Sequence, residues 1–242
     1  MRPLNRTINL IVVSLVILVG CGKTIDAGKL QDRQGIFYEI NSAEPFTGTA
    51  VERYDNGQKM SERIYVAGKP EGLATEWYEN GQKRRERYYA DGRQNGLSAS
   101  WYENGQKQGQ GDFVDGKENG LHTQWYENGE KEGEGTFVDG KRDGLYKYWD
   151  EDGQIRYEAN YVDGNPHGRT TSWYANGKKQ SEGNYIDGKE DGLHSQWYED
   201  GQIQREANFV SGRQHGLTTT WGNDGQLLNE ENWVDGEVVD SE

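Results

Sequence analysis

Apolar and polar residues alternate along most of the chain, with a period of two residues. The segment 121–126, Leu-His-Thr-Gln-Trp-Tyr, is representative. In it Leu121, Thr123 and Trp125 alternate with His122, Gln124 and Tyr126. This alternation is typical of a β-strand with one face covered and the other less so. No stretch beyond residue 21 carries a helical period of three to four. The pattern therefore predicts an all-β fold.

The alternating segments belong to a unit that recurs every 24 residues. A periodic pattern of this kind indicates a repeat protein, in which each unit packs mainly on its neighbours. Glycines follow the same period in three columns, of which Gly57 to Gly225 is one. The tryptophans of the period are Trp77, Trp101, Trp125, Trp149, Trp173, Trp197 and Trp221.

Two turn signals divide each unit into two strands. The first is Asn-Gly or Asp-Gly, as at Asn128-Gly129, and such pairs tolerate the positive φ of tight hairpin turns. The second is Asp-Gly-Lys-x-x-Gly, as at 139–144, which we expect to form a longer loop with two unusual backbone angles. Each unit is therefore predicted to be a β-hairpin.

The length of the first turn sets which side chains share a face, because one residue of register moves every side chain across. A three-residue loop, 127–129, would place Trp125 beside Gly133, Gly135 and Phe137, and we favour it. A two-residue loop would place Trp125 beside Glu132 and Glu134 instead. On the favoured reading, the face opposite the tryptophans carries Glu62, Glu86, Glu134, Glu158, Glu182, Glu206 and Glu230, with Gln110 in one place.

A lone hairpin of this size is not stable in water, so each unit must be supported by the next. We therefore expect a single-layer repeat array of antiparallel β-hairpins, about eight units over residues 51–242. The aperiodic segment 35–50 is predicted to cap the N-terminal edge, and residues 21–34 to form a tether.

Residues 1–20 have the features of a secretory signal peptide. Two arginines precede an apolar run of about twelve residues, whereas a membrane-spanning helix needs about 20. The run ends Leu-Val-Gly-Cys and resembles a bacterial lipobox, which implies acylation of Cys21, the only cysteine. The alternatives are an unlipidated signal or an uncleaved anchor. Because Gly22 follows the cysteine, we expect a lipid-anchored envelope protein at the outer membrane or cell surface rather than the inner membrane.

The overall charge narrows the choice of partners. Lys and Arg number 27 against 41 Asp and Glu, giving a net charge of −14. An acidic chain of this kind is not expected to bind nucleic acid, which requires a basic surface. The negative charge also disfavours electrostatic docking on anionic lipid, so we expect contact with the membrane only through the N-terminal lipid.

No pattern in the sequence predicts catalysis or a cofactor. The four histidines lie far apart and without cysteines, so we expect them at turns or facing solvent rather than in a metal site. The Asp-Gly turns lack the spacing of a calcium loop. No phosphate-binding loop or nucleophile elbow is present in the sequence. A row of seven glutamates indicates a solvated face rather than a tuned catalytic pair. We therefore expect no enzyme, no cofactor and no small-molecule substrate.

The units resemble the MORN-type repeat in its bacterial variant. The resemblance rests on Trp-Tyr-Glu-Asn-Gly followed by Val-Asp-Gly-Lys-x-x-Gly, and on the opening Pro45-Phe-Thr-Gly48. It covers residues 35–236. Arg53, Arg169 and Gly222 depart from the pattern, at a Trp, a Leu and a Tyr position. Some members of this family are labelled antitoxins, which is awkward beside a secretory signal.

The sequence leaves three functional hypotheses. We favour a membrane-anchored scaffold that binds another, unidentified protein. An immunity protein that neutralises a toxin is the alternative, and a saccharide-binding envelope module is a weaker one. For the scaffold, the expected contact residues are an exposed tyrosine column, since aromatic residues are favoured at interfaces. Its members are Tyr54, Tyr78, Tyr102, Tyr126, Tyr174 and Tyr198.

Overall fold

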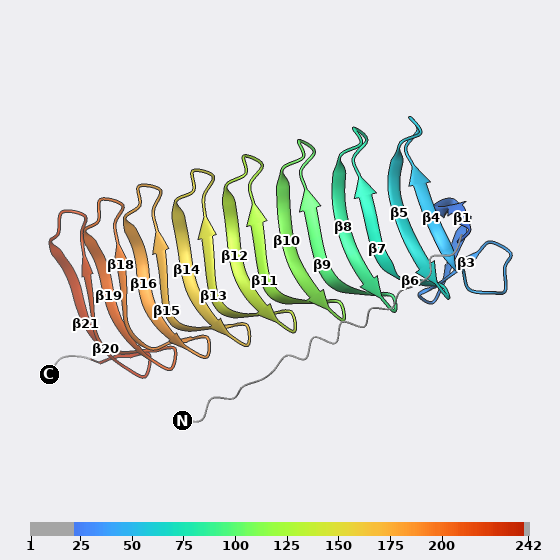
Figure 1. Ribbon diagram of the computed structural model, residues 1–242. Helices are drawn as coiled ribbons and strands as arrows, with labels where there is room; N and C mark the ends of the chain where they lie inside the picture. The colour runs from blue at the N-terminus through green and yellow to red at the C-terminus, as the bar shows by residue number, and fades with distance from the viewer. Residues whose placement is uncertain (1–21, 240–242) are drawn as a thin grey trace, which may run out of the picture.

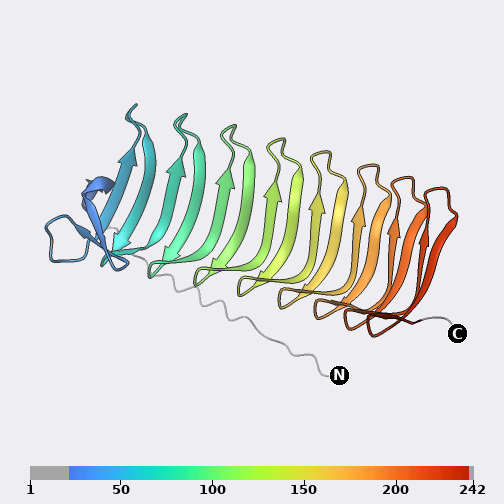
Figure 2. The same cartoon turned by 180° about the vertical axis from the view of Figure 1, so that it is seen from behind.

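The chain forms one long ribbon of β-strands. A computed structural model describes residues 22–239, which make a twenty-stranded sheet and a small two-stranded sheet at the N-terminal end (Figure 1). Seen from behind, the ribbon is a single layer with hairpins in chain order (Figure 2). The predicted all-β array of repeated hairpins is confirmed.

Each unit contributes a first strand, which ends at the tryptophan or at Arg53 in the first unit, and a second strand, which follows the Asn-Gly or Asp-Gly turn. The first strands are β4 (Gly48–Arg53), β7 (Gly72–Trp77), β9 (Arg93–Trp101), β11 (Lys117–Trp125), β13 (Lys141–Trp149), β15 (Asn165–Trp173), β18 (Gly192–Trp197) and β20 (Arg213–Trp221). The second strands are β5 (Lys59–Val66), β8 (Lys83–Ala90), β10 (Lys107–Val114), β12 (Lys131–Val138), β14 (Ile155–Val162), β16 (Lys179–Ile186), β19 (Ile203–Val210) and β21 (Leu227–Val234). Short strands β6 (Lys69–Pro70), β17 (Lys189–Glu190) and β22 (Glu237–Val239) extend the pairing.

The turn at the upper edge of Figure 1, here called the tip turn, is a three-residue loop, as favoured from the sequence. In the unit of β11 and β12, the Gly129 N–H donates to the Tyr126 carbonyl, and the Tyr126 N–H donates to the Glu130 carbonyl, both at 2.9 Å. Gly129 has φ +91°, a conformation that glycine adopts without a steric cost. The loop therefore consists of residues 127–129.

The predicted distribution of side chains between the two faces is wrong, because a β-bulge follows the turn. Trp125 pairs with Lys131, but Gln124 pairs with Gly133, so the second strand holds one extra residue. One extra residue moves the rest of the strand to the other face. Thr123 consequently lies opposite Glu134, and the glutamate column shares the face of the tryptophans. We call this side, with Leu121, Thr123, Trp125 and Glu134 and their repeat equivalents, the tryptophan face.

The other side is here called the glycine face. It holds His122, Gly133, Gly135 and Phe137 and their repeat equivalents. His122 lies opposite Gly135, and Phe137 lies opposite Gly120. The glycines therefore accommodate histidine and phenylalanine rings rather than the indole rings.

The turn at the lower edge of Figure 1, here called the base turn, has only two residues. Val138 pairs directly with Lys141, and both turn residues have positive φ, 52° at Asp139 and 81° at Gly140. These angles define the hairpin turn that suits the right-handed twist of two strands. The expected longer loop is therefore wrong. Gly144, with φ 105°, lies within β13, where the register to β12 is irregular.

Consecutive base turns are joined by backbone hydrogen bonds. The Gly140 N–H donates to the Glu118 carbonyl of the preceding unit at 2.9 Å. The equivalent glycine of every unit from Gly92 to Gly236 makes the same bond. Because few large side chains are fully covered in a single layer, such bonds between units carry much of the cohesion. In the described part of the chain, no large side chain is less than 2% exposed.

The N-terminal edge is covered by a cap that begins earlier than expected. The cap consists of β1 (Thr24–Asp26), a 3₁₀ turn η1 (Ala27–Lys29), β2 (Leu30–Arg33) and β3 (Ile36–Glu39). β1 pairs in parallel with β4, and Ile25 packs in a small buried cluster with Phe46, Ala50 and Tyr65. The segment 21–34, expected to be a tether, is therefore folded from Thr24. The predicted signal peptide, 1–20, and Cys21 lie outside the described residues.

Candidate interaction surfaces

The tyrosine column joins each tip to the next. Tyr102 donates its phenolic O–H to the Trp125 carbonyl at 2.8 Å, and Tyr126 donates to the Trp149 carbonyl at the same distance. The remaining four tyrosines make the equivalent bond, at 2.7–2.9 Å. These pairs are Tyr54 with Trp77, Tyr78 with Trp101, Tyr174 with Trp197, and Tyr198 with Trp221.

All six tyrosines of the column are half-buried rather than exposed. Burial and the nearby carboxylate of Glu132 raise the pKa of Tyr102. Burial and a hydrogen bond to Tyr148 raise the pKa of Tyr126. The hydrogen bonds of the six phenols hold the rings in fixed positions, where they connect units. Their predicted role in binding a partner stays a prediction.

The tip asparagines make a second connection between units. The Asn128 side chain accepts a hydrogen bond from the Glu130 N–H at 2.9 Å and donates one to the Glu151 carbonyl of the next tip at 2.7 Å. An aspartate can make only the first of these bonds, because an ionised carboxylate has no hydrogen to donate. Aspartate takes this position in three units, at Asp152, Asp200 and Asp224.

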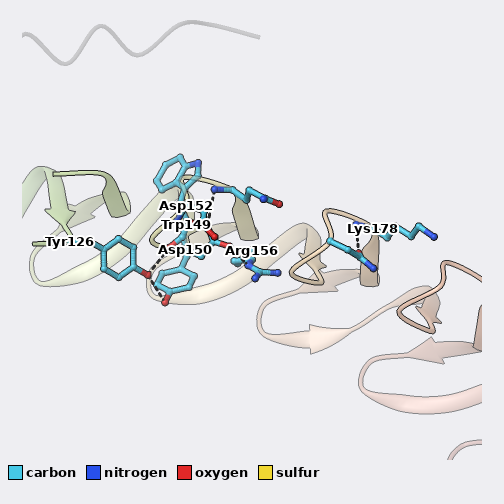
Figure 3. Close-up of polar contacts among 9 residues, drawn as sticks. Tyr126, Trp149, Asp150, Asp152, Arg156 and Lys178 are labelled. Carbon is cyan, nitrogen blue, oxygen red and sulfur yellow. Dashed lines mark hydrogen bonds and ion pairs between the residues drawn. The ribbon is translucent and has the colours of Figure 1, made fainter. Parts of the chain in front are cut away.

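One junction lacks both connections, because Asp150 replaces the tyrosine and Asp152 the asparagine of the same tip (Figure 3). Asp150 instead binds Arg156 within its own hairpin, at 2.7 Å between the carboxylate and Nε. The backbone N–H of Gln154 and the Arg156 guanidinium lower the pKa of this carboxyl. Figure 3 shows Tyr126 directed toward Trp149, while Asp150 is directed toward Arg156.

Lysines and glutamates of the tryptophan face form ion pairs beside the indole rings. Lys107 Nζ lies 5.7 Å from the ring centroid of Trp125, in the following unit. Lys131 repeats this contact with Trp149 at 5.9 Å and also pairs with Glu134 at 2.7 Å. Cation–π contacts and exposed ion pairs each contribute modestly to stability. Several glutamates of the column are therefore paired with a lysine of their own strand.

The tryptophan face also carries a long row of exposed aliphatic side chains near the base turns. We call it the aliphatic stripe, and sequence reasoning missed it because the strand register was wrong. Its members are 40–56% exposed, and they recur in register along the ribbon. They are Val66, Leu97, Val114, Leu121, Val138, Leu145, Val162, Ile186, Leu193, Val210, Leu217 and Val234.

Two histidines lie on the glycine face, each between two aromatic rings. His122 lies 5.4 Å from Phe113 and 5.0 Å from Phe137 between ring centroids, and His194 is held in the same way by Tyr185 and Phe209. The His122 side chain is 14% exposed and its Nε2 lies 2.8 Å from the Asp112 carbonyl oxygen. The expectation of solvent-facing or turn histidines is therefore wrong for these two, because they fill the space above glycines.

The family of the chain follows from a comparison with protein-family models. The model described as the MORN repeat variant matches six segments of 22 residues each, together more than half of the chain: 70–91, 94–115, 118–139, 142–163, 166–187 and 190–211. The chain belongs to the MORN repeat variant family. No curated protein matches it. The structure extends the same hairpins beyond the matched segments, to β4 at one end and β21 at the other.

One part of the glycine face of this MORN array is hollow. Gly109 and Gly133 flank Gln124 in the register of β10, β11 and β12, so the sheet is nearly bare there. A cavity of about 180 Å³ lies above them. Its walls include Arg85, Ser98, Ser100, His122 and Tyr146. It combines aromatic rings with hydroxyl, amide and guanidinium groups, the mixture usual in small-ligand pockets.

Neither a metal-binding cluster nor a membrane-spanning helix is present in residues 22–239. Within that range, no cluster of three or more His, Cys, Asp or Glu side chains is arranged to hold a metal ion. The same range contains no helix with the length and apolar character needed to cross a membrane.

Proposed function

We propose that this MORN array is a lipid-anchored scaffold outside the cytoplasm, which binds another protein along the aliphatic stripe. The observation that supports this proposal is the exposure of twelve aliphatic side chains in one repeated row. Extended apolar surfaces on soluble domains commonly mark interaction sites, because exposing them to water is unfavourable. A rigid ribbon that repeats the same contact in each unit is suited to a long partner.

The stripe is tested by three substitutions in neighbouring hairpins, Leu121→Ser, Val138→Ser and Leu145→Ser. A matched control, Ile40→Ser with Val238→Ser, changes exposed apolar residues outside the stripe. Proteins captured from envelope extract by the wild type and the control, but lost with the stripe variant, would support the scaffold. Equal capture by all three would contradict it. Changing the tyrosine column is a poorer test, because those residues connect the tips.

The proposed anchor rests on the lipobox-like sequence ending at Cys21. We expect the full-length chain to incorporate labelled palmitate and to sediment with membranes. Cys21→Ser should abolish both properties and leave the repeat array folded, as judged by circular dichroism. A wild-type chain that is soluble and unacylated would contradict the anchor while leaving the stripe untested by this experiment.

Saccharide binding is a second candidate, favoured by the cavity above Gly109 and Gly133. A volume of about 180 Å³, rings on the wall, and hydroxyl, amide, carboxylate and guanidinium groups suit a single sugar ring. Gly109→Leu would fill the hollow, and we expect it to abolish any signal of the wild type on a glycan array. If the wild type gives no signal on the array, saccharide binding is excluded. The immunity hypothesis would gain support only from a toxin encoded beside this gene.

A further inference from the structure

The two ends of the ribbon differ in how their edge strands are covered. At the N-terminal end, β1 pairs with β4 from Thr24 to Asp26, and the cap packs against it. At the C-terminal end, β22 pairs with only three residues of β21, Asn232 to Val234. Among the described residues, nothing pairs with the outer side of Leu227–Glu231. We call these five residues the open edge.

The open edge is unusual in its exposed apolar side chains. Leu227 is 55% exposed and Leu228 is 65% exposed, the largest fraction among the exposed apolar residues. Asn229 and Glu230 are also exposed. Edge strands offer unpaired N–H and C=O groups to other chains, and proteins usually blunt them. This edge combines an apolar surface with backbone groups that pair with no described residue, and together these favour the addition of a strand.

The inner units show which strand fits this edge. Glu134, the equivalent of Glu230 four units earlier, lies opposite Lys147 in the register of β12 and β13. Lys131, the equivalent of Leu227, lies 5.9 Å from the ring of Trp149. A strand that follows β21 as β13 follows β12 would therefore set a cation opposite Glu230 and an indole beside Leu227. Burial of Leu227 under that ring would be favourable.

A second copy of this chain fits the open edge poorly. Each copy would bring Glu230 and Glu231, so antiparallel pairing of two such edges would gather four carboxylates within a few residues. Like charges facing one another across strands are destabilising. Each chain also carries a net charge of −14, which opposes self-association. The charges of the edge instead complement a basic segment.

We propose that the open edge binds an extended segment of another protein as an additional antiparallel strand. That segment carries a basic residue opposite Glu230 and an aromatic residue beside Leu227. The site is separate from the aliphatic stripe, so it does not depend on the proposed scaffold function.

The test uses a synthetic peptide with the sequence of residues 145–160, which contains Lys147 and Trp149 in the required spacing. Binding of the fluorescently labelled peptide to the full chain is followed by anisotropy. We expect saturable binding, and a loss of about tenfold or more in affinity when the peptide carries Lys147→Glu. The chain variant Glu230→Lys should bind the original peptide more weakly and should restore binding of the Lys147→Glu peptide.

Glu237→Lys is the matched control, because it changes the charge equally on the neighbouring strand β22. It should leave peptide affinity within about twofold of the wild type, a change below 0.5 kcal/mol. Absence of saturable binding would overturn the proposal, as would equal affinity for both peptides. Concentration-dependent dimers of the chain alone, abolished by Leu228→Lys in sedimentation, would assign the edge to a second copy and also overturn it.

Discussion

At the scale of single residues, the sizes of neighbouring side chains on the glycine face are matched between units. His122 lies over Gly111, where an added Cβ would come within 2.1 Å of the ring. His194 covers Gly183 in the same way, at 2.2 Å. Where alanine replaces glycine, at Ala159 and Ala207, the following unit has the smaller Thr170 and Thr218. A glycine thus accompanies a ring, and an alanine accompanies a threonine.

Gly111→Ala should therefore destabilise the array, because His122 must leave its place between Phe113 and Phe137. We expect a loss of about 1–3 kcal/mol, the usual cost of overpacking, measured by urea unfolding. Adding His122→Thr should recover most of it, since this recreates the pairing of Ala159 with Thr170. Gly109→Ala is the control, because the atom nearest to its Cβ would be the Ser100 hydroxyl oxygen, at 3.2 Å. Equal losses in both single variants would contradict the size rule.

The buried phenols predict how stability changes at alkaline pH. The pKa values of Tyr102, Tyr126, Tyr157 and Tyr185 are raised in the folded chain, chiefly by burial. Above the ordinary tyrosine pKa of about 10, the unfolded chain loses these protons and the folded chain retains them. The melting temperature should therefore be unaffected by these groups below pH 10 and fall above it. In a spectroscopic pH titration of the folded chain, Tyr126→Phe should remove part of the phenolate absorbance that appears above pH 10. If all phenolate absorbance appears by about pH 10, the prediction is refuted.

At the scale of elements, the base turns require a left-handed conformation at a residue other than glycine. Asp139 adopts φ 52°, and six units have aspartate at this place, whereas Ala67 and Ser211 hold it with φ 48° and 51°. Short polar side chains such as Asp and Asn tolerate this region better than alanine does.

Ala67→Asn should therefore stabilise the chain by up to about 1 kcal/mol, and Asp139→Ala should destabilise it by a similar amount. Thermal unfolding of the two variants beside the wild type measures both effects. Asp55→Ala, at an exposed tip position, serves as the control for a simple loss of charge. A gain in stability from Asp139→Ala would show that the turn angle is not what favours aspartate.

The same turns explain which parts of the fold the sequence could predict. The 24-residue period, the hairpins and the three-residue tip loop follow from Gly, Asn and Trp positions, since these residues have narrow backbone or packing requirements. The bulge at the start of each second strand carries no such residue. Its extra position holds Met60, Arg84, Gln108, Glu132, Arg156, Gln180, Gln204 and Leu228. The strand register, and with it the aliphatic stripe, therefore emerged only from the structure.

The prediction of the candidate site from the sequence had a different limit. The tyrosines recur in a column, and recurrence alone cannot separate a residue that binds a partner from one that joins two units. Their phenolic bonds to the next tryptophan carbonyl depend on the spacing between tips, a three-dimensional quantity. The sequence therefore located the tyrosine column, but it could not show that these side chains are half-buried and join neighbouring units.

At the scale of the whole molecule, the ribbon is a chain of junctions of unequal strength. Most neighbouring tips share a tyrosine bond and an asparagine bond, as between Tyr126 and Trp149 and between Asn128 and Glu151. The junction that follows Asp150 has neither, although the backbone pairing of β14 with β15 continues through it. Two missing hydrogen bonds correspond to about 1–3 kcal/mol of local stability. The tips on either side of this junction should therefore open more often than the others.

Hydrogen exchange of backbone amides tests this inequality, since exchange reports local opening. Amides of the tip 150–154 should exchange about tenfold faster than those of the tip 126–130, which has both connections. The double variant Asp150→Tyr with Asp152→Asn should slow exchange to the rate of other tips. Arg156 would keep a partner there, as Arg84 does at 5.9 Å from the ring of Tyr78. Asp163→Asn, in a base turn, should leave the tips unchanged. Uniform exchange across all tips of the wild type would mean that the strand ladder alone sets their stability.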